Sequence, residues 1–138
     1  MRAKVYLQKI TFYDSRIESN QERIKAYKDS AVNKTSNLSP NKVQSSSSKQ
    51  KMESAVVSYS DLERILKILE KNRQEIIDDI GLLEPLESTV LYKCYVDKKT
   101  LWEVADDMEK SYSWVTKVHS NGMRNLQNIL DSRNSVQK

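Results

Sequence analysis

Glycine and proline are scarce in this sequence, with two residues of each among 138. All-β folds need such residues at the frequent turns between their strands, so the scarcity argues against that class. The stretches that look ordered are rich in Leu, Ile, Lys, Glu and Gln, most of which favour helices. We therefore predict an all-α fold, with room for one modest core or for a small domain plus an extended element.

Cysteine and histidine occur once each, as Cys94 and His119. One cysteine cannot form an internal disulfide, and one Cys with one His makes no metal site. Cys94 lies in an apolar helical stretch, so a packed thiol is expected. The sequence also lacks a glycine-rich phosphate loop and a nucleophile–base pair. These absences predict a protein that is not an enzyme and uses no cofactor or metal. Adjacent carboxylates such as Asp78–Asp79 are expected on solvated helix faces.

Long apolar runs are missing as well, because none approaches the ~20 residues needed to cross a membrane. The opening stretch MRAKVYLQKITFYDS lacks the uninterrupted apolar core of a signal peptide. A lone cysteine also fits a reducing compartment. We predict a cytoplasmic protein that has no membrane partner.

The net charge of +4 is unevenly distributed along the chain. Residues 1–51 hold eleven Lys or Arg against four Asp or Glu, whereas residues 52–97 hold five against ten. A mildly basic chain is weak evidence for nucleic acid binding by itself. The two opposite blocks would suit helices that pack side by side.

The first 32 residues are predicted to form one amphipathic helix. Apolar residues recur at spacings of four and three, which is the heptad pattern of a coiled-coil seam. One polar residue, Asn20, interrupts the seam, and such residues can fix register or partner number. The seam positions are Tyr6, Ile10, Tyr13, Ile17, Asn20, Ile24, Tyr27 and Ala31.

A Ser-rich linker is predicted over residues 33–50, because this stretch has too little apolar surface to offset its ordering entropy. A long heptad helix over 51–83 follows. Ser60 could begin its stronger part, since SDLE has the form of a capping box. Arg73 is the polar break in this seam, whose positions are Met52, Ala55, Tyr59, Leu62, Leu66, Leu69, Arg73, Ile76, Ile80 and Leu83.

Each seam leaves an apolar stripe that needs a partner. The two long helices could therefore form an antiparallel hairpin within one chain, or they could pair between subunits. Pairing between subunits would give a homodimer or a higher homo-oligomer. The regular periods favour a coiled coil over a globular bundle.

Residues 84–132 are predicted to form a small module of three short helices, followed by a tail at 133–138. Pro85 suits the first turn of a helix. Thr100 is a predicted N-cap that forms a capping box with Glu103, and Ser111 is a predicted N-cap of the last helix. The predicted inward face of the last helix consists of Val115, Val118, Gly122, Leu126 and Ile129.

The last two helices, with a tight turn between them, have the form of a helix-turn-helix. The outward face of the last helix would carry short hydroxyls and two cations, namely Ser113, Thr116, Lys117, Ser120 and Arg124. Such groups can reach base edges and phosphates in the major groove. Residues 111–130 hold no acid, so double-stranded DNA is the predicted partner.

The stretch TLWEVADDMEKSYSWVTKVHSNGMRNL (residues 100–126) resembles region 4 of bacterial sigma factors. The shared pattern is Thr-Leu-x-Glu, an aliphatic residue and Ala, then a short turn, then Ser-x-x-x-Val and a Leu-rich tail. The whole layout is similar to phage late transcription regulators of the RinA/ArpU type. These also combine an N-terminal helix, a Ser-rich loop, a long acidic helix and a C-terminal sigma-like module.

The resemblance implies roles for seven side chains of the last helix. Base-reading positions would be Tyr112, Ser113, Thr116 and Lys117, and positions nearer the DNA backbone would be Ser120, Asn121 and Arg124. One departure is Glu109, which stands where the family pattern usually has a turn glycine. This departure predicts a turn that is strained or differently shaped.

The predicted function is a sequence-specific DNA-binding transcription regulator, encoded by a phage or prophage and acting in the cytoplasm of the bacterial host. The resemblance adds host RNA polymerase as a candidate partner. Two alternatives stay open. One is a DNA-packaging recognition subunit like a small terminase, and the other is a coiled-coil interaction protein that does not bind DNA.

Overall fold

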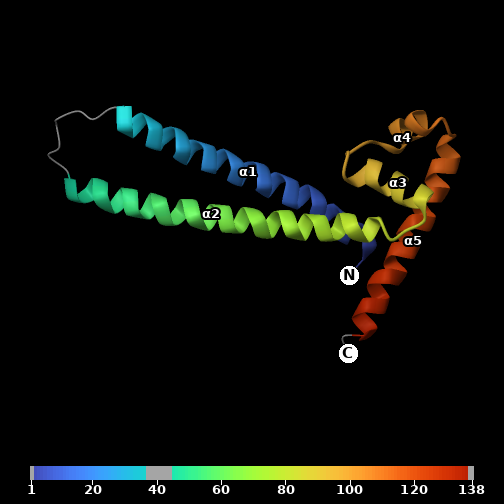
Figure 1. Ribbon diagram of the computed structural model, residues 1–138. Helices are drawn as coiled ribbons and strands as arrows, with labels where there is room; N and C mark the ends of the chain where they lie inside the picture. Colours follow the sequence, from blue (N-terminus) through green and yellow to red (C-terminus); the bar gives the residue numbers. More distant parts are fainter. Residues whose placement is uncertain (1, 37–44, 137–138) are drawn as a thin grey trace. The chain divides into compact units, whose positions relative to one another are not determined.

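The computed structural model describes the backbone of residues 2–36 and 45–136, and the side chains of residues 2–30 and 59–135. This part of the chain is helical and has no strand, which confirms the all-α prediction. The helices are α1 (Ala3–Ser36), α2 (Ser45–Ile80), α3 (Pro85–Tyr95), α4 (Leu101–Met108) and α5 (Tyr112–Val136) (Figure 1). None of them is both long enough and apolar enough to span a membrane.

The chain divides into two compact units, each containing parts of α1 and α2. One unit, here called the hairpin unit, is residues 15–71. The other, here called the multi-helix module, combines residues 1–14 with residues 72–138. Within the expected linker at 33–50, α1 extends to Ser36 and α2 begins at Ser45. Residues 37–44 lie outside the described part.

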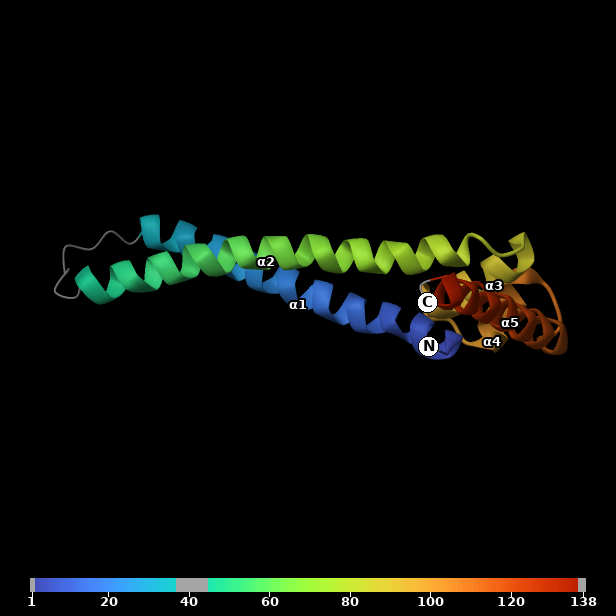
Figure 2. The same ribbon diagram turned by 90° about the horizontal axis from the view of Figure 1, so that it is seen from below.

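In the hairpin unit, α1 and α2 run in opposite directions beside each other (Figures 1 and 2). Ile24 and Leu62 are buried at the predicted seam positions, and the polar seam residue Asn20 is buried with them. The two seams therefore meet within one chain. The prediction that Ser60 begins a stronger helix is wrong, because α2 is continuous from Ser45 to Ile80. A capping box needs non-helical backbone before it, and here the preceding residues are already helical.

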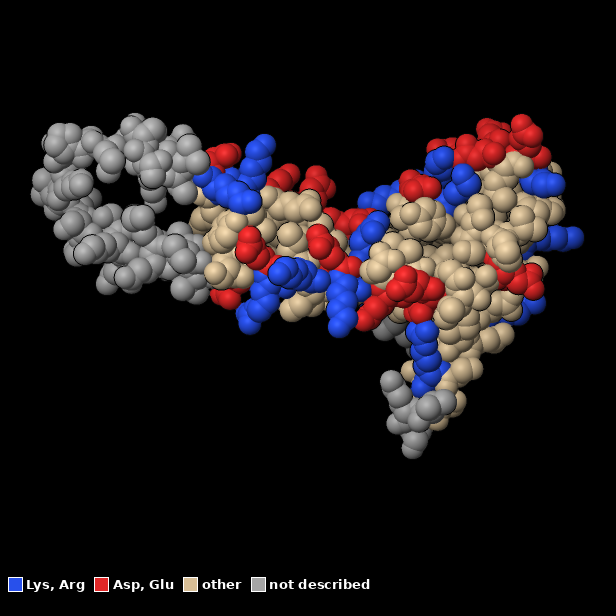
Figure 3. All heavy atoms as spheres, in the orientation of Figure 1, with Lys and Arg blue, Asp and Glu red and all other residues tan. Residues whose placement is uncertain are grey.

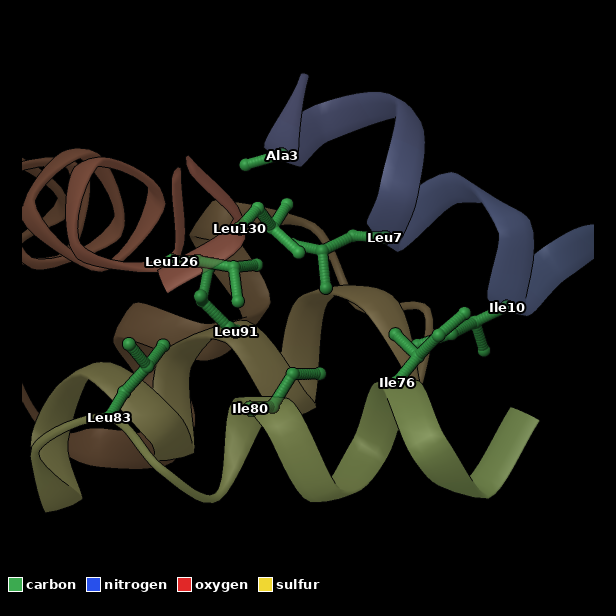
Figure 4. Close-up of a cluster of buried hydrophobic side chains, with 9 residues drawn as sticks. All are labelled: Ala3, Leu7, Ile10, Ile76, Ile80, Leu83, Leu91, Leu126 and Leu130. Carbon is green, nitrogen blue, oxygen red and sulfur yellow. The ribbon is translucent and has the colours of Figure 1, made fainter. Parts of the chain in front are cut away.

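The first core of the multi-helix module joins the first turns of α1, the end of α2, α3 and α5 (Figure 4). Ile76, Ile80 and Leu83 are buried there, as the second seam predicts. Leu7 is fully buried beside them, although it lies outside the predicted first seam. The cluster consists of Ala3, Leu7, Ile10, Ile76, Ile80, Leu83, Leu91, Leu126 and Leu130.

A second core holds α3, α4 and α5 together. It consists of Val90, Val104, Ala105 and Val115, and Trp114 and Val118 pack at its edge. Ala105 is small at the point where α4 meets α5, which lets the two helices approach closely. These four buried side chains make α3, α4 and α5 one packed unit.

Two ion pairs tie the long helices into this module. Arg73, the polar break in the second seam, places its Nε 2.5 Å from Asp14 Oδ1. Asp79 is only 6% exposed, and Arg133 binds both of its carboxylate oxygens, at 2.7 and 2.8 Å. The expectation of a solvated Asp79 is therefore wrong. Its carboxylate faces α1 and α5, where Tyr6 also donates a hydrogen bond to it.

Candidate nucleic-acid interface

Local capping chemistry places the helices of the module. Pro85 begins α3, and Thr100 caps α4 with a complete capping box, in which the Glu103 amide donates to Thr100 Oγ1 at 3.2 Å. Ser111 Oγ accepts a hydrogen bond from the Trp114 amide at 3.1 Å, which satisfies a free N–H in the first turn of α5. All three predicted helix starts are confirmed.

The turn between α4 and α5 is built on Glu109, which has φ 54° and ψ 43° in the left-handed region. The Lys110 amide donates to Ala105 O at 3.0 Å, and the Glu109 amide donates to Asp106 O at 3.2 Å. These two bonds make a Schellman motif, in which glycine is usual at the left-handed position. The turn therefore has the usual Schellman shape. Its strain is confined to Glu109, which carries a Cβ but adopts a left-handed conformation that favours glycine.

The inner face of α5 contacts α3 closely at Gly122. A Cβ built on Gly122 would lie 3.2 Å from Leu91 Cδ1 and 3.4 Å from Glu87 Cβ. One turn later, Asn125 Nδ2 donates to both carboxylate oxygens of Glu87 at 2.9 Å. Close approach of α5 to α3 therefore accounts for a glycine on the inward face of α5.

The outer face of α5 forms an exposed polar surface, here called the α5 stripe. Its members recur at spacings of three and four residues, which keeps side chains on one face of a helix. All five are exposed, and they are Ser113, Lys117, Ser120, Asn121 and Arg124. The next acid along α5 is Asp131, which accepts a hydrogen bond from Gln127.

The two remaining predicted residues lie at the edge of the α5 stripe. Tyr112 stacks on Trp102 of α4, with ring centroids 4.1 Å apart and an interplanar angle of 17°. Thr116 is half-buried, and its hydroxyl donates to Tyr112 O at 2.8 Å. The structure therefore gathers five predicted side chains into one surface and holds the other two against the module.

The cations of the multi-helix module fall into two groups. Five pair with carboxylates, namely Arg73 and Lys98 with Asp14, Lys93 and Lys99 with Asp107, and Arg133 with Asp79. Six others make no ion pair with any described residue, and they are Arg2, Lys4, Lys9, Lys110, Lys117 and Arg124. Two of these six belong to the α5 stripe.

Acidic side chains gather over α4, whereas basic side chains lie along the outer edge of α5 (Figure 3). Lys99 lies against Asp107, and this contact lowers the pKa of Asp107 and raises that of Lys99. The lysines before α4 thus offset acids of the same region. The unpaired positive charge is left on and around α5.

His119 and Cys94 lie on the inner side of the module. His119 Nε2 is 3.1 Å from the Tyr95 hydroxyl, and the two rings are stacked. Burial, with a smaller effect from the charge of Lys4, lowers the pKa of His119. Burial also raises the pKa of the Cys94 thiol. The partly buried Cys94 thiol agrees with the packed role expected of it.

Two residues were missed when the sequence was considered alone. Lys110 is exposed, and its Nζ lies 5.3 Å from the centre of the Trp114 ring. Trp102 is 65% exposed and stacks on Tyr112 beside the first turn of α5. The sequence signal for Lys110 was its position next to the turn, whereas Trp102 lies seven positions before Glu109 and no local pattern indicates its contact with Tyr112.

Comparisons of this chain with protein-family models, curated proteins and solved structures found no match. Within the described residues, no group of three or more His, Cys, Asp or Glu side chains is arranged to hold a metal ion. The resemblance to sigma region 4 therefore stays a prediction that depends on residues 100–126.

Proposed function

We propose that this protein is a sequence-specific DNA-binding transcription regulator that inserts α5 into the major groove. The observation that carries the proposal is the α5 stripe, which is exposed, contains no acid and holds two unpaired cations, Lys117 and Arg124. Most other cations of α3 to α5 are paired with carboxylates. A surface that carries no acid, and whose cations form no ion pair within the protein, is suited to bind a polyanion such as DNA.

The dimensions of the module suit this insertion. An α-helix with its side chains is about 10–12 Å wide, and the major groove is about 12 Å wide. In such a complex, Ser113 and Lys117 near the start of α5 face the base edges, together with Thr116 and Tyr112. Ser120, Asn121 and Arg124 then lie nearer the sugar-phosphate backbone. Lysine can donate to guanine acceptors, and serine can donate to or accept from several bases.

The role in transcription, rather than in another process on DNA, is supported by the resemblance of residues 100–126 to sigma region 4. The same resemblance is the ground for a phage or prophage origin and for host RNA polymerase as a partner. One module offers few phosphate contacts, so a monomer would bind weakly. Pairing of two chains would let the protein read two half-sites with higher avidity.

The direct test is selection of bound duplexes from random DNA at two salt concentrations. We expect enrichment of one motif that persists at the higher salt. Lys117→Ala should weaken binding to the selected duplex by about 1–3 kcal/mol and relax the preference at one position. The matched control is Lys67→Ala, which removes an exposed lysine of the hairpin unit. This control should leave both the affinity for the selected duplex and the base preference unchanged. Salt-sensitive binding without any enriched motif would refute sequence-specific recognition.

A mass measurement in solution distinguishes the proposed regulator from a DNA-packaging subunit. We expect a monomer or a dimer for the regulator, because one or two copies suffice to read one or two half-sites. A closed ring of many subunits would instead favour the packaging role. Normal folding of Lys117→Ala and Thr116→Ala with unchanged binding to every selected duplex would favour a coiled-coil interaction protein.

A further inference from the structure

The first turn of α1 lies directly against α5. The Ala3 amide donates a hydrogen bond to Gln127 Oε1 at 2.7 Å. The Ala3 side chain is buried in the first core beside Leu130, which comes from the same helix (Figure 4). The start of α1 is therefore anchored to α5 by both a polar and an apolar contact, although 124 positions separate Ala3 from Gln127.

This contact brings two exposed cations to the side of α5. Arg2 and Lys4 flank the anchored Ala3, both are exposed, and neither pairs with a described carboxylate. Lys4 is close enough to α5 that its charge helps to lower the pKa of His119. Arg2 and Lys4 thus resemble Lys117 and Arg124, and they differ from the five cations of the module that are neutralised by aspartates.

The position of Gln127 shows which side of the α5 stripe these cations occupy. Successive residues of a helix are about 100° apart. On that basis Gln127 and Thr116 lie along one edge of the stripe, whereas Trp114 and Asn121 lie along the other. Lys110 sits over Trp114 at this second edge. The stripe therefore has an unpaired cation of α1 beside one edge and Lys110 beside the other.

We propose that Arg2 and Lys4 form a second DNA-contacting element, which binds the phosphate backbone on the α1 side of the groove that α5 enters. When a helix fills the major groove, the two phosphate strands pass on either side of it. Cations placed beside the helix rather than on its outer face then meet phosphates instead of bases. This element rests on the proposed function, because it requires α5 to be in the groove.

The test compares the full chain with the double variant Arg2→Gln plus Lys4→Gln. The matched control is Lys67→Gln plus Lys71→Gln, which removes two exposed, unpaired lysines of the hairpin unit and causes the same change in net charge. Affinity is measured at salt concentrations from 50 to 200 mM, on the duplex selected from random DNA and on a scrambled duplex of equal length. Melting curves check that all proteins are folded.

Each phosphate contact contributes about 0.9 to the slope of log affinity against log salt. The loss of two contacts should therefore reduce the slope by about 1.8, so that the affinity of the wild type falls about 12-fold more than that of the variant over this fourfold salt range. The effect should be equal on both duplexes, because phosphates carry no sequence information. The control should keep the wild-type slope.

Phosphate ethylation interference gives a second readout. We expect phosphates on one side of the selected site whose ethylation weakens the wild type but not the Arg2→Gln plus Lys4→Gln variant. If the wild type selects a motif but the variant keeps its slope and its interference pattern, the second element is refuted while the proposed function stands. If the wild type selects no motif, the proposed function fails and this element fails with it.

Discussion

Glycine in place of Glu109 should stabilise the multi-helix module. With φ 54° and ψ 43°, Glu109 is in the left-handed region, which costs a residue with a Cβ about 1–2 kcal/mol. Glycine avoids this cost but loses more chain entropy on folding, about 0.5–1 kcal/mol. The expected net gain in the free energy of unfolding, taken between the midpoints of these two ranges, is therefore about 0.75 kcal/mol.

Urea denaturation followed by tryptophan fluorescence suits this measurement, because the chain has two tryptophans and both lie beside the turn, as Trp102 and Trp114. Glu109→Ala is the control, since it removes the same carboxylate but keeps the Cβ and should show no gain. The Schellman hydrogen bonds come from backbone groups, so both variants retain them. The two variants are compared at equal slopes of the free energy of unfolding against urea concentration. If the glycine variant is then no more stable than the alanine variant, the left-handed conformation of Glu109 is not a source of strain.

Three further predictions concern the packing and the buried polar groups of the same module. Gly122→Ala should change stability by less than about 1 kcal/mol, because its gain in helix propensity is offset by a tight contact with Leu91. Gly122→Leu should instead cost about 1–3 kcal/mol, because a large side chain does not fit between α5 and α3. Equal stability of the two variants in urea denaturation would contradict the close approach of these helices. Arg133→Met should cost about 1–3 kcal/mol at pH 7, because it leaves the buried Asp79 carboxylate without its bidentate partner. Although burial alone would raise the pKa of Asp79, the hydrogen bonds from Arg133 and Tyr6 lower it. The stability that the Asp79–Arg133 ion pair contributes is therefore present above the unfolded pKa of about 3.9 and is lost as pH falls below it. The difference between wild type and Arg133→Met should therefore narrow in denaturation curves from pH 5 to pH 2, and a constant difference would argue against the ion pair. Because burial lowers the pKa of His119, this histidine is protonated at a higher pH in the unfolded chain than in the folded chain. The free energy of unfolding should therefore fall as pH drops below about 6.5. His119→Gln should reduce this pH dependence of stability between pH 7.5 and 5.

The helices and their starts could be predicted because their causes are local. Thr100, Ser111 and Pro85 each act on backbone groups within one turn, so their roles can be read from a few neighbouring residues. The seam positions whose side chains are described could also be predicted, since a heptad period alone decides which residues share a face, whereas Ala31, Met52 and Ala55 lie outside the described side chains. Ser60 shows the limit of this reasoning, because the same capping pattern has no such role inside a continuous helix.

The roles of charged residues could not be predicted in the same way. Asp79 and Arg133 are 54 positions apart, and nothing in either local pattern indicates that they meet. The Asp78–Asp79 pair looks like a solvated face in the sequence, yet only Asp78 is exposed. The burial of a charge depends on what the neighbouring helices bring to it, so a local pattern cannot distinguish the two aspartates.

By itself, the sequence determined an all-α chain, two apolar seams and a polar face on α5, because helical period and capping are properties of neighbouring residues. Only the tertiary structure decided which cations are neutralised by carboxylates, which are left unpaired beside α5, and that the first turn of α1 lies against that helix. These outcomes depend on contacts between helices that are distant in sequence. They arise when packed cores bring those helices together, and no local pattern encodes them.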